Sequence, residues 1–250
     1  MINFEDYLKN PCRESSIPYW KAKSISVPQE IKILHQDDYD AAKYPQYTDE
    51  PYFRLKHDLN GLSAPQLPQG YALCAPALKR FAAHINPCYQ GIHIREAELQ
   101  AYTARPVYLS SLWLAVQDNK TGDIVATGIA ELDSDCKEGI LEWIQVSEQD
   151  RGRGLGSYIV NELLWRMKDI ARFATVSGQC NNPTNPESLY RRCGFTGNDV
   201  CHPLRQVFSQ IANPQFPGTH DCHYHKISSC TFFRYIVYLY ITLYHIINIR

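Results

Sequence analysis

A glycine-rich stretch in the middle of the chain reads Val146-Ser147-Glu148-Gln149-Asp150-Arg151-Gly152-Arg153-Gly154-Leu155-Gly156-Ser157. It follows a strand-like run that ends at Val146, and it opens a helical pattern with apolar residues at four-residue spacing. Glycines let a backbone come close to a phosphate, and a helix N-terminus presents unpaired N–H groups and a partial positive charge. Arg151 and Arg153 add formal charge at the same place. The stretch therefore predicts a site for a ligand that carries a pyrophosphate.

Two other glycine-rich motifs fit this stretch less well. A Walker loop ends in Gly-Lys-Ser/Thr, whereas Gly156 is followed directly by Ser157 with no lysine. A dinucleotide-binding fingerprint needs Gly-x-Gly-x-x-Gly within a parallel βαβ unit, whereas the glycines here alternate and the preceding strands read as a meander. A nucleotide-binding protein would need the missing lysine or a parallel sheet, so neither of these two motifs accounts for the stretch.

The patterns around the stretch predict a meander of strands followed by alternating helices and strands. Upstream, we expect strands at residues 71–75, 112–116, 124–132 and 140–146, and helices from after Pro76 to residue 84 and at 95–102. Downstream, we expect a helix at 154–170, a strand at 173–180 and a short helix at 187–193, which Gly194 ends. This order places the glycine-rich turn between the meander and the first of the later helices.

A second motif lies in the short helix: Asn185-Pro186-Glu187-Ser188-Leu189-Tyr190-Arg191-Arg192-Cys193-Gly194-Phe195. With it, the chain resembles the GNAT superfamily of acetyltransferases. Members carry Arg/Gln-x-x-Gly-x-Gly/Ala, with the Arg five positions after the apolar end of a strand, and later an Asn, a helix with Leu-Tyr, and Gly-Phe. Val146 and Arg151 keep the first spacing. The resemblance covers roughly residues 71–200 and implies the GNAT acyl-CoA N-acyltransferase fold, an α/β (α+β) fold with a mixed, mostly antiparallel central sheet flanked by helices.

The resemblance also implies acetyl-CoA as the cosubstrate and no metal. The residues that it assigns to the cofactor are Gln145, Val146, Arg151, Gly152, Arg153, Gly154, Leu155, Gly156, Ser157 and Asn185. By this resemblance, N–H groups of residues 151–156 would hold the pyrophosphate, and Gln145 and Val146 would pair with the pantetheine amide as a strand does. The backbone near Val146 would polarise the thioester carbonyl, which is oxyanion-type stabilisation. Asn185 is equally a simple turn former, because it precedes a proline.

Tyr190 is the expected general acid. In the family, the matching tyrosine lies near the sulfur and can protonate the departing thiolate, and a phenol has the required reach and proton. The alternative is that the ring of Tyr190 packs in the core and its hydroxyl only satisfies a local partner.

Glu142 is the leading candidate for the general base, acting directly or through water. A base is needed because an amine is protonated at neutral pH and an ammonium cannot attack. Glu131 and Asp133, on the neighbouring predicted strand, are the reserves. The competing reading for each of them is a solvated strand carboxylate.

The chain departs from the family pattern in two places. Glu148 stands where many members have a proline, which makes the turn before Arg151 less rigid. The stretch 200–204 is interrupted by Pro203, so we do not expect a usual final strand to close the sheet at that edge.

Composition bounds the domain organisation and the partners. The chain has 250 residues and a formal net charge of -1, which gives no large basic field for nucleic acid. We expect an N-terminal extension at 1–69 with strand-like runs at 30–35 and 52–57, an acetyltransferase domain at 70–205 and an atypical hydrophobic tail at 206–250. The extension is either a flap or pair of strands on the substrate side, or a structural addition. The acidic start and nine scattered cysteines favour a cytoplasmic protein with free thiols.

The tail carries two further features. Residues 231–247 are apolar for about the length of a short membrane span, interrupted by Arg234 and His245. A membrane anchor is one reading, a core element or a frameshifted stretch are others, and we favour a tail without function. The cysteines and histidines at 220–230 match no standard zinc spacing, so we expect no metal there.

The resemblance thus implies an N-acetyltransferase that moves an acetyl group from acetyl-CoA directly to a primary amine, without a covalent enzyme intermediate. The alternative is a GNAT-fold module that binds acyl-CoA as a sensor or partner without turnover. The acceptor is a small-molecule or peptide amine that the sequence does not identify, and a homodimer is possible.

Overall fold

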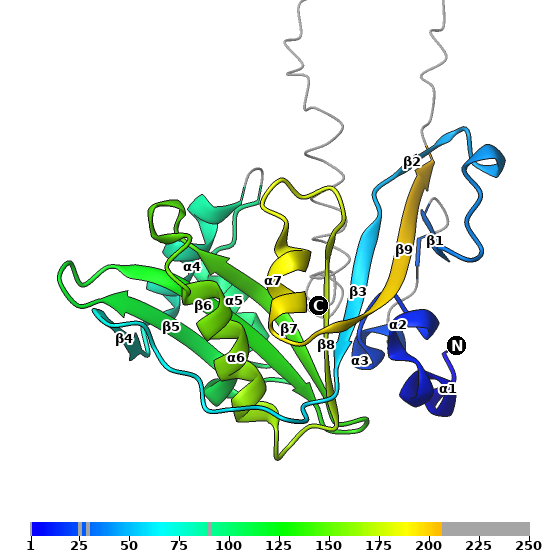
Figure 1. Cartoon of the computed structure of the whole chain (residues 1–250). Helices are drawn as coiled ribbons and strands as arrows, with labels where there is room; N and C mark the ends of the chain where they lie inside the picture. The colour runs from blue at the N-terminus through cyan, green and yellow to red at the C-terminus, as the bar shows by residue number, and fades with distance from the viewer. Residues whose placement is uncertain (1, 25–26, 29–30, 90–91, 207–250) are drawn as a thin grey trace, which may run out of the picture.

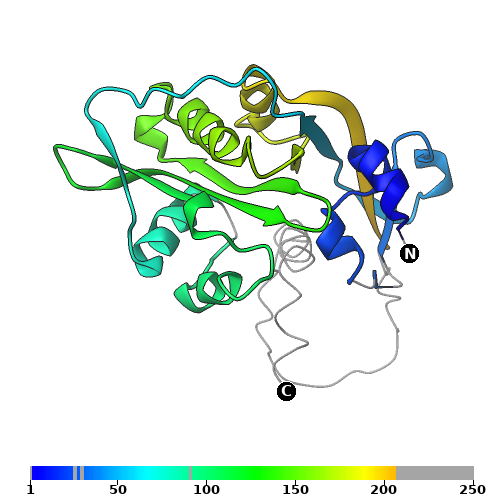
Figure 2. The ribbon, with the colours of Figure 1, turned by 90° about the horizontal axis from the view of Figure 1, so that it is seen from below.

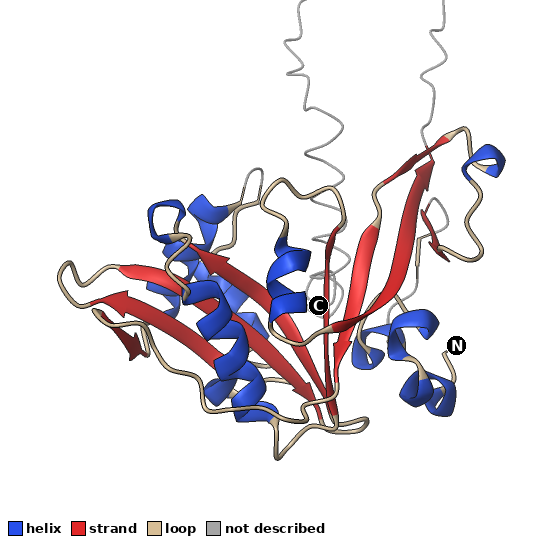
Figure 3. Cartoon of the chain, in the orientation of Figure 1, coloured by secondary structure: helices blue, strands red, loops and turns tan. Residues whose placement is uncertain are grey.

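The computed structural model describes residues 2–24, 27–28, 31–89 and 92–206, and one large sheet organises them (Figures 1 and 3). Its strands are β1 (Ile31–His35), β2 (Tyr47–Asp49), β3 (Tyr52–His57), β4 (Tyr71–Cys74), β5 (Trp113–Asp118), β6 (Ile124–Asp133), β7 (Glu138–Val146), β8 (Phe173–Gln179) and β9 (Thr196–Gln206). The order across the sheet is β1-β9-β3-β8-β7-β6-β5-β4, and β2 also pairs with β9. All these pairings are antiparallel except β7 with β8, which is parallel. The expected mixed, mostly antiparallel sheet is confirmed.

Helices cover both faces of this sheet, as Figure 2 shows. They are α1 (Phe4–Lys9), α2 (Pro11–Glu14), α3 (Tyr19–Ala22), α4 (Leu78–Ile85), α5 (Glu96–Tyr102), α6 (Leu155–Met167) and α7 (Pro186–Arg192). Short 3-10 helices occur at Ala41–Lys43, Asn86–Cys88, Ser110–Leu112 and Glu148–Asp150. One face carries α6 and α7, and the other carries α4 and α5. On the latter face Trp20 of α3 packs with Val107 and with Ile140 of β7, so the N-terminal helices share it.

Two glycines bring α6 close to the sheet. A Cβ atom on Gly128 of β6 would overlap the side chain of Ile159, and one on Gly139 of β7 would overlap Met167. Helix and strands approach this closely because neither glycine has a side chain. The apolar stripe of α6 is then buried in the main core, which fixes the helix N-terminus beside the end of β7.

The two parallel strands, β7 and β8, separate about half-way along their length. Residues 138–141 of β7 pair with residues 173–176 of β8, but β7 continues to Val146 and β8 to Gln179 without further pairing between them. On its other edge, β7 has a β-bulge between Leu141 and Ile144, opposite Gly128 and Ala130 of β6. The result is an opening between two adjacent strands, next to the bulge.

The expectation for the final strand is wrong. β9 is an 11-residue strand that pairs with β3 on one side and with β1 on the other. The N–H of Gln36 donates to the carbonyl of Val200. Hydrogen-bonded and non-hydrogen-bonded pairs alternate along antiparallel strands, so the backbone nitrogen of Pro203 points away from β1. On the opposite edge of β9, pairing with β3 ends at Cys201 and pairing with β2 begins at Leu204. Proline's missing N–H therefore falls in a gap, and the strand continues through it.

The strands expected near residues 30–35 and 52–57 are β1 and β3. β3 lies between β8 and β9, so residues from the predicted extension are integral to the sheet. Apart from Gln206, the predicted tail, with its apolar run at 231–247 and the cysteines and histidines at 220–230, lies outside the described residues. Within the described residues, no helix combines the length and apolar character needed to cross a membrane.

Candidate active site

The glycine-rich turn joins the end of β7 to the start of α6. Gly152 and Gly154 have φ of +77° and +82°, a left-handed conformation that side chains rarely adopt. Gly154 is the N-cap of α6, and residues 151–154 are exposed. A Cβ atom on Gly152 would meet nothing within 4 Å. The turn therefore presents backbone to open space at a helix N-terminus, as an anion site requires.

The other residues of the stretch have different surroundings. Arg153 pairs with Asp150 at 3.0 Å and donates to the hydroxyl of Tyr71 at 2.9 Å, whereas Arg151 reaches the carbonyl of Val146 at 3.4 Å. Leu155 is buried in the core, so only its backbone faces the turn. Burial raises the pKa of the Cys193 thiol, and the side chain of Ser157, in the first turn of α6, partly opposes that rise. A Cβ on Gly156 would lie 3.3 Å from Leu189, so this glycine allows α6 and α7 to pack closely.

The opening between β7 and β8 adjoins this turn. From residue 142 to Val146, the edge of β7 that faces β8 has no strand partner among the described residues. Unpaired N–H and C=O groups on a strand edge are a template for an extended ligand. The backbone of Gln145 and Val146 lies on this edge.

The side chain of Gln145 belongs to a buried polar chain on the α4 side of the sheet. Its Nε2 donates to the hydroxyl of Thr127, and its Oε1 accepts from the hydroxyl of Tyr89 at 3.3 Å. His84 contacts Thr127 at 2.9 Å and Ser147 at 3.1 Å through its two ring nitrogens. Burial lowers the pKa of His84. This network of hydrogen bonds holds the side-chain amide of Gln145 in place. The backbone of Gln145 remains on the edge of β7 that faces the opening.

Tyr190, on α7, is almost fully buried, with its ring against Phe53 and Phe195. Its hydroxyl makes no hydrogen bond to another described residue. Burial raises the pKa of Tyr190 well above its ordinary value of 10.0, so the phenol keeps its proton at neutral pH. Burial, and to a smaller extent the Tyr190 phenol, raises the pKa of Tyr89. The ring of Tyr190 does pack in the core, yet its hydroxyl is left without a local partner in the described part of the chain.

Asn185 begins α7 in a left-handed conformation, with φ of +46°. Its side-chain oxygen accepts the N–H of Ser188 at 3.3 Å and so caps the helix. Asn185 therefore has the turn-forming role that the sequence allowed. The cap uses its side-chain oxygen, so the N–H groups of the Asn185 side chain remain as donors.

Glu142 lies at the bulge of β7, on the face of the sheet that α3 covers. Its Oε1 is 2.5 Å from Nζ of Lys21, and the two side chains are 11% and 2% exposed. A bulge places consecutive residues on one face of a sheet, and bulges often occur beside active sites. Glu142 is therefore not a solvated carboxylate, and its counter-ion comes from the N-terminal helices.

The reserve carboxylates are also buried. Glu131 pairs with Arg105 at 2.5 Å, and burial raises the pKa of Glu131 while Lys21 opposes that shift. Asp133 accepts the N–H of Asp135 at 2.9 Å. Lys21, Glu142, Glu131 and Arg105 thus form one cluster of two cations and two anions.

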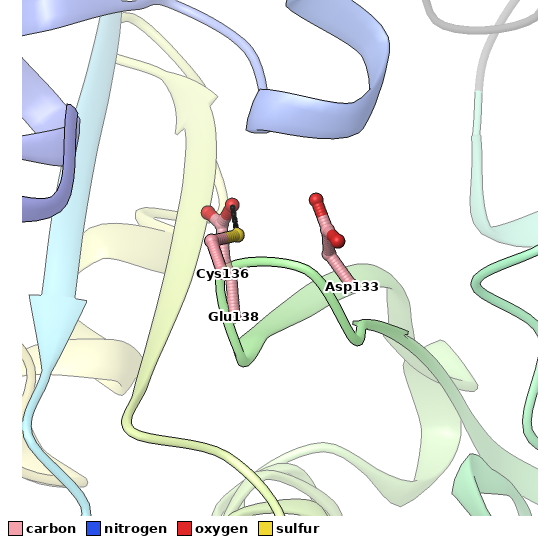
Figure 4. Close-up of side chains that lie close together, drawn as sticks. All are labelled: Asp133, Cys136 and Glu138. Atoms are coloured by element: carbon pink, nitrogen blue, oxygen red, sulfur yellow. Dashed lines mark hydrogen bonds between the residues drawn. The ribbon is translucent and has the colours of Figure 1, made fainter. Parts of the chain in front are cut away.

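Asp133 also lies near Cys136 and Glu138, and potential metal-ligating atoms of the three lie within 4.8 Å of one another (Figure 4). Glu138 already accepts hydrogen bonds from Tyr7 at 2.7 Å and Thr175 at 2.5 Å, and it pairs with Arg54 at 3.1 Å. These donors neutralise and saturate the carboxylate, which favours a structural role over cation binding.

Sequence reasoning missed Lys21, Arg105 and Tyr89. Each lies far along the chain from its partner, and one lysine, arginine or tyrosine among many carries no local signal. The bulge was equally invisible, because residues 138–146 show a plain strand pattern.

Comparisons with known proteins found a matching domain and proteins of the same fold. Residues 109–197 match the model of an acetyltransferase (GNAT) domain. No curated protein matches the chain in sequence at a significant level. A GCN5-related N-acetyltransferase from Sphaerobacter thermophilus superposes with a TM-score of 0.57 at 18% identity, over 72% of this chain and 61% of that chain. An acetyltransferase from the GNAT family of Colwellia psychrerythraea gives a TM-score of 0.52 at 13% identity, over 75% and 69%.

A tandem GNAT protein from the clavulanic acid biosynthesis pathway gives a TM-score of 0.50 at 13% identity, over 66% of this chain and 56% of that chain. The chain therefore spans about three fifths of the Sphaerobacter protein and less of the tandem protein. At these identities the structures establish the shared fold, and the domain match covers the strands, glycine turn and short helix that build the site. Residues 109–197 therefore match a GNAT acetyltransferase domain, and the chain shares the fold of these GNAT structures.

Proposed function

We propose that the protein is an N-acetyltransferase that moves an acetyl group from acetyl-CoA directly to a primary amine. The observation that carries the proposal is the opening between β7 and β8, which begins after Leu141 and Val176 and ends at the glycine turn. A pantetheine arm fits a free strand edge, and a pyrophosphate fits the N-terminus of α6. The open space at Gly152 supports this fit.

The thioester supplies an activated acetyl carbonyl, and the residues around the opening supply the proton transfers. Glu142 takes one proton from the acceptor ammonium, after which the amine nitrogen bonds to the acetyl carbon as the carbon–sulfur bond breaks. Tyr190 donates its proton to the sulfur and recovers a proton from the new amide nitrogen. One proton is released to solvent overall. Direct transfer needs no covalent intermediate on the enzyme.

Calorimetric titration of acetyl-CoA into the full chain tests the proposal. We expect micromolar-range binding that Gly154→Asp abolishes, because aspartate adds strain and a negative charge at the phosphate turn. Gly61→Asp is the matched control, since Gly61 also has a positive φ and open space but lies in the turn after β3. Absence of binding by the folded wild-type chain, or equal loss in both variants, would refute the coenzyme A site.

The Lys21–Glu142 ion pair favours a second candidate, an acyl-CoA-binding module without turnover, because the carboxylate that would accept the proton is already in contact with a lysine. Release of the coenzyme A thiol in the presence of a panel of amines separates the two. Binding without thiol release above the rate of hydrolysis would favour the module.

A further inference from the structure

A cavity of about 160 Å³ begins where β7 and β8 separate. Glu142 of β7 and Ser177 of β8 line this end of the cavity, and Ile33 of β1 and Pro203 of β9 line the other. Residues 16–18 and Lys21 from the N-terminal segment lie over it. The cavity thus runs along one face of the sheet, away from the glycine turn, and one end adjoins the opening between β7 and β8.

The lining divides into a charged end and an apolar body. Most of the wall is apolar, with Ile17, Ile33, Ile140 and Pro203 as examples. The charged lining residues are Lys21, Glu142 and Arg54, and Arg54 is already paired with buried Glu138. An engineered apolar cavity of about 150 Å³ holds a benzene molecule, so this space has the size of a leucine or phenylalanine side chain.

The charges at this end are balanced. Lys21 and Arg105 face Glu142 and Glu131 within one buried cluster, and Arg54 faces Glu138. A simple ammonium entering the cavity would add an uncompensated buried cation, which is costly. A zwitterion adds no net charge, and its two groups can replace the Lys21–Glu142 contact with two new ion pairs.

We propose that the cavity binds a free α-amino acid with an apolar side chain. Its carboxylate pairs with Lys21, its ammonium pairs with Glu142, and its side chain fills the apolar body between β1, β9 and the N-terminal segment. This inference rests on the proposed function, because it names the acceptor of the same reaction. It makes the N-terminal segment the specificity-determining part of the site, and the product is the N-acetyl amino acid.

Three ligands of matched shape test the charge requirement. L-leucine carries both groups, 3-methylbutylamine lacks the carboxylate, and 4-methylpentanoate lacks the ammonium. Binding to the full chain is measured by calorimetry, with and without saturating coenzyme A. We expect L-leucine to bind at least about ten-fold more tightly than either analogue, since each lost charged contact costs that much or more.

A double variant and a matched control test whether the charges of L-leucine contact Lys21 and Glu142. Lys21→Met/Glu142→Gln removes both charges and keeps the balance, so the protein retains its fold, and we expect it to lose the preference for L-leucine over the amine. Lys23→Met is the matched control, because Lys23 is an exposed neighbour that pairs with Asp135. It is expected to bind L-leucine as the wild type does.

The outcomes separate this inference from the proposed function. Equal binding of L-leucine and 3-methylbutylamine, no L-leucine binding in either condition, or an unchanged preference in the double variant overturns the amino-acid site, even where acetyl-CoA binds. Preferential L-leucine binding that the double variant loses supports the site, even where acetyl-CoA does not bind and the transferase proposal fails.

Discussion

The Nζ atom of Lys21 lies 2.5 Å from Oε1 of Glu142, although the two residues are 121 positions apart in the chain. One comes from a four-residue helix in the N-terminal segment, and the other from the bulge of β7. The pair is therefore a buried contact between the predicted extension and the candidate site. Its energetic weight is open to direct measurement.

Replacing Lys21 by methionine should destabilise the protein by about 3 kcal/mol, because it leaves the Glu142 carboxylate buried without its counter-ion. The midpoint of urea unfolding measures this change. Adding Glu142→Gln should recover most of the loss, since the remaining partners are both neutral. A double variant as unstable as Lys21→Met would show that packing of the lysine stem, and not charge, was the cause.

Tyr190→Phe should lower kcat by about 100-fold or more, because the thiolate then leaves without a positioned proton donor. Affinity for acetyl-CoA should stay within about two-fold, since the ring and its contacts with Phe53 and Phe195 remain. Thiol release and calorimetry on the same preparation provide both numbers. Because burial raises the pKa of Tyr190 above 10.0, the wild-type rate should not fall through its ionisation below that pH. An unchanged kcat in the variant would remove Tyr190 from the mechanism.

Stability should fall on acidification from pH 7 to pH 5, in part through His84. Its pKa is lowered by burial in the folded protein, whereas in the unfolded chain it lies near 6.5. The unfolded state therefore binds more protons as the pH drops through 6.5, which favours unfolding. Urea unfolding at the two pH values should show a smaller acid loss in His84→Gln. His93→Gln is the control at an exposed histidine and should match the wild type.

Gly128→Ala should destabilise the protein by about 1–3 kcal/mol, because the added methyl group overlaps Ile159 of α6. Displacement of α6 should also weaken acetyl-CoA binding, since the helix N-terminus carries the glycine turn. A double-mutant cycle with Ile159→Ala checks the contact, and the two substitutions should be less destabilising together than the sum of the single effects. Additive effects would place the strain elsewhere.

Local patterns determined much of this protein. The strands and helices from residue 71 to residue 193 follow from alternation, four-residue spacing and turn residues, all of which act between neighbours in the chain. The glycine turn could also be predicted from the sequence, because positive φ at Gly152 and Gly154 and the start of the helix depend on the local backbone alone. β9 was misjudged because a proline inside a strand is harmful only when its N–H faces a partner, and register decides that.

Tertiary structure alone decided which charged groups meet. Glu142 was identifiable as a strand carboxylate, but its bulge, its pairing with Lys21 and the burial of Glu131 against Arg105 depend on segments that are distant in sequence. The cavity has the same origin, since β1, β3, β7, β8, β9 and the N-terminal segment each contribute to it. The sequence itself determined the glycine turn and the order of elements, because those depend on local backbone preferences. Only the packed sheet set the charge balance around the acceptor, because side chains are desolvated and paired by contacts that form when distant segments fold together.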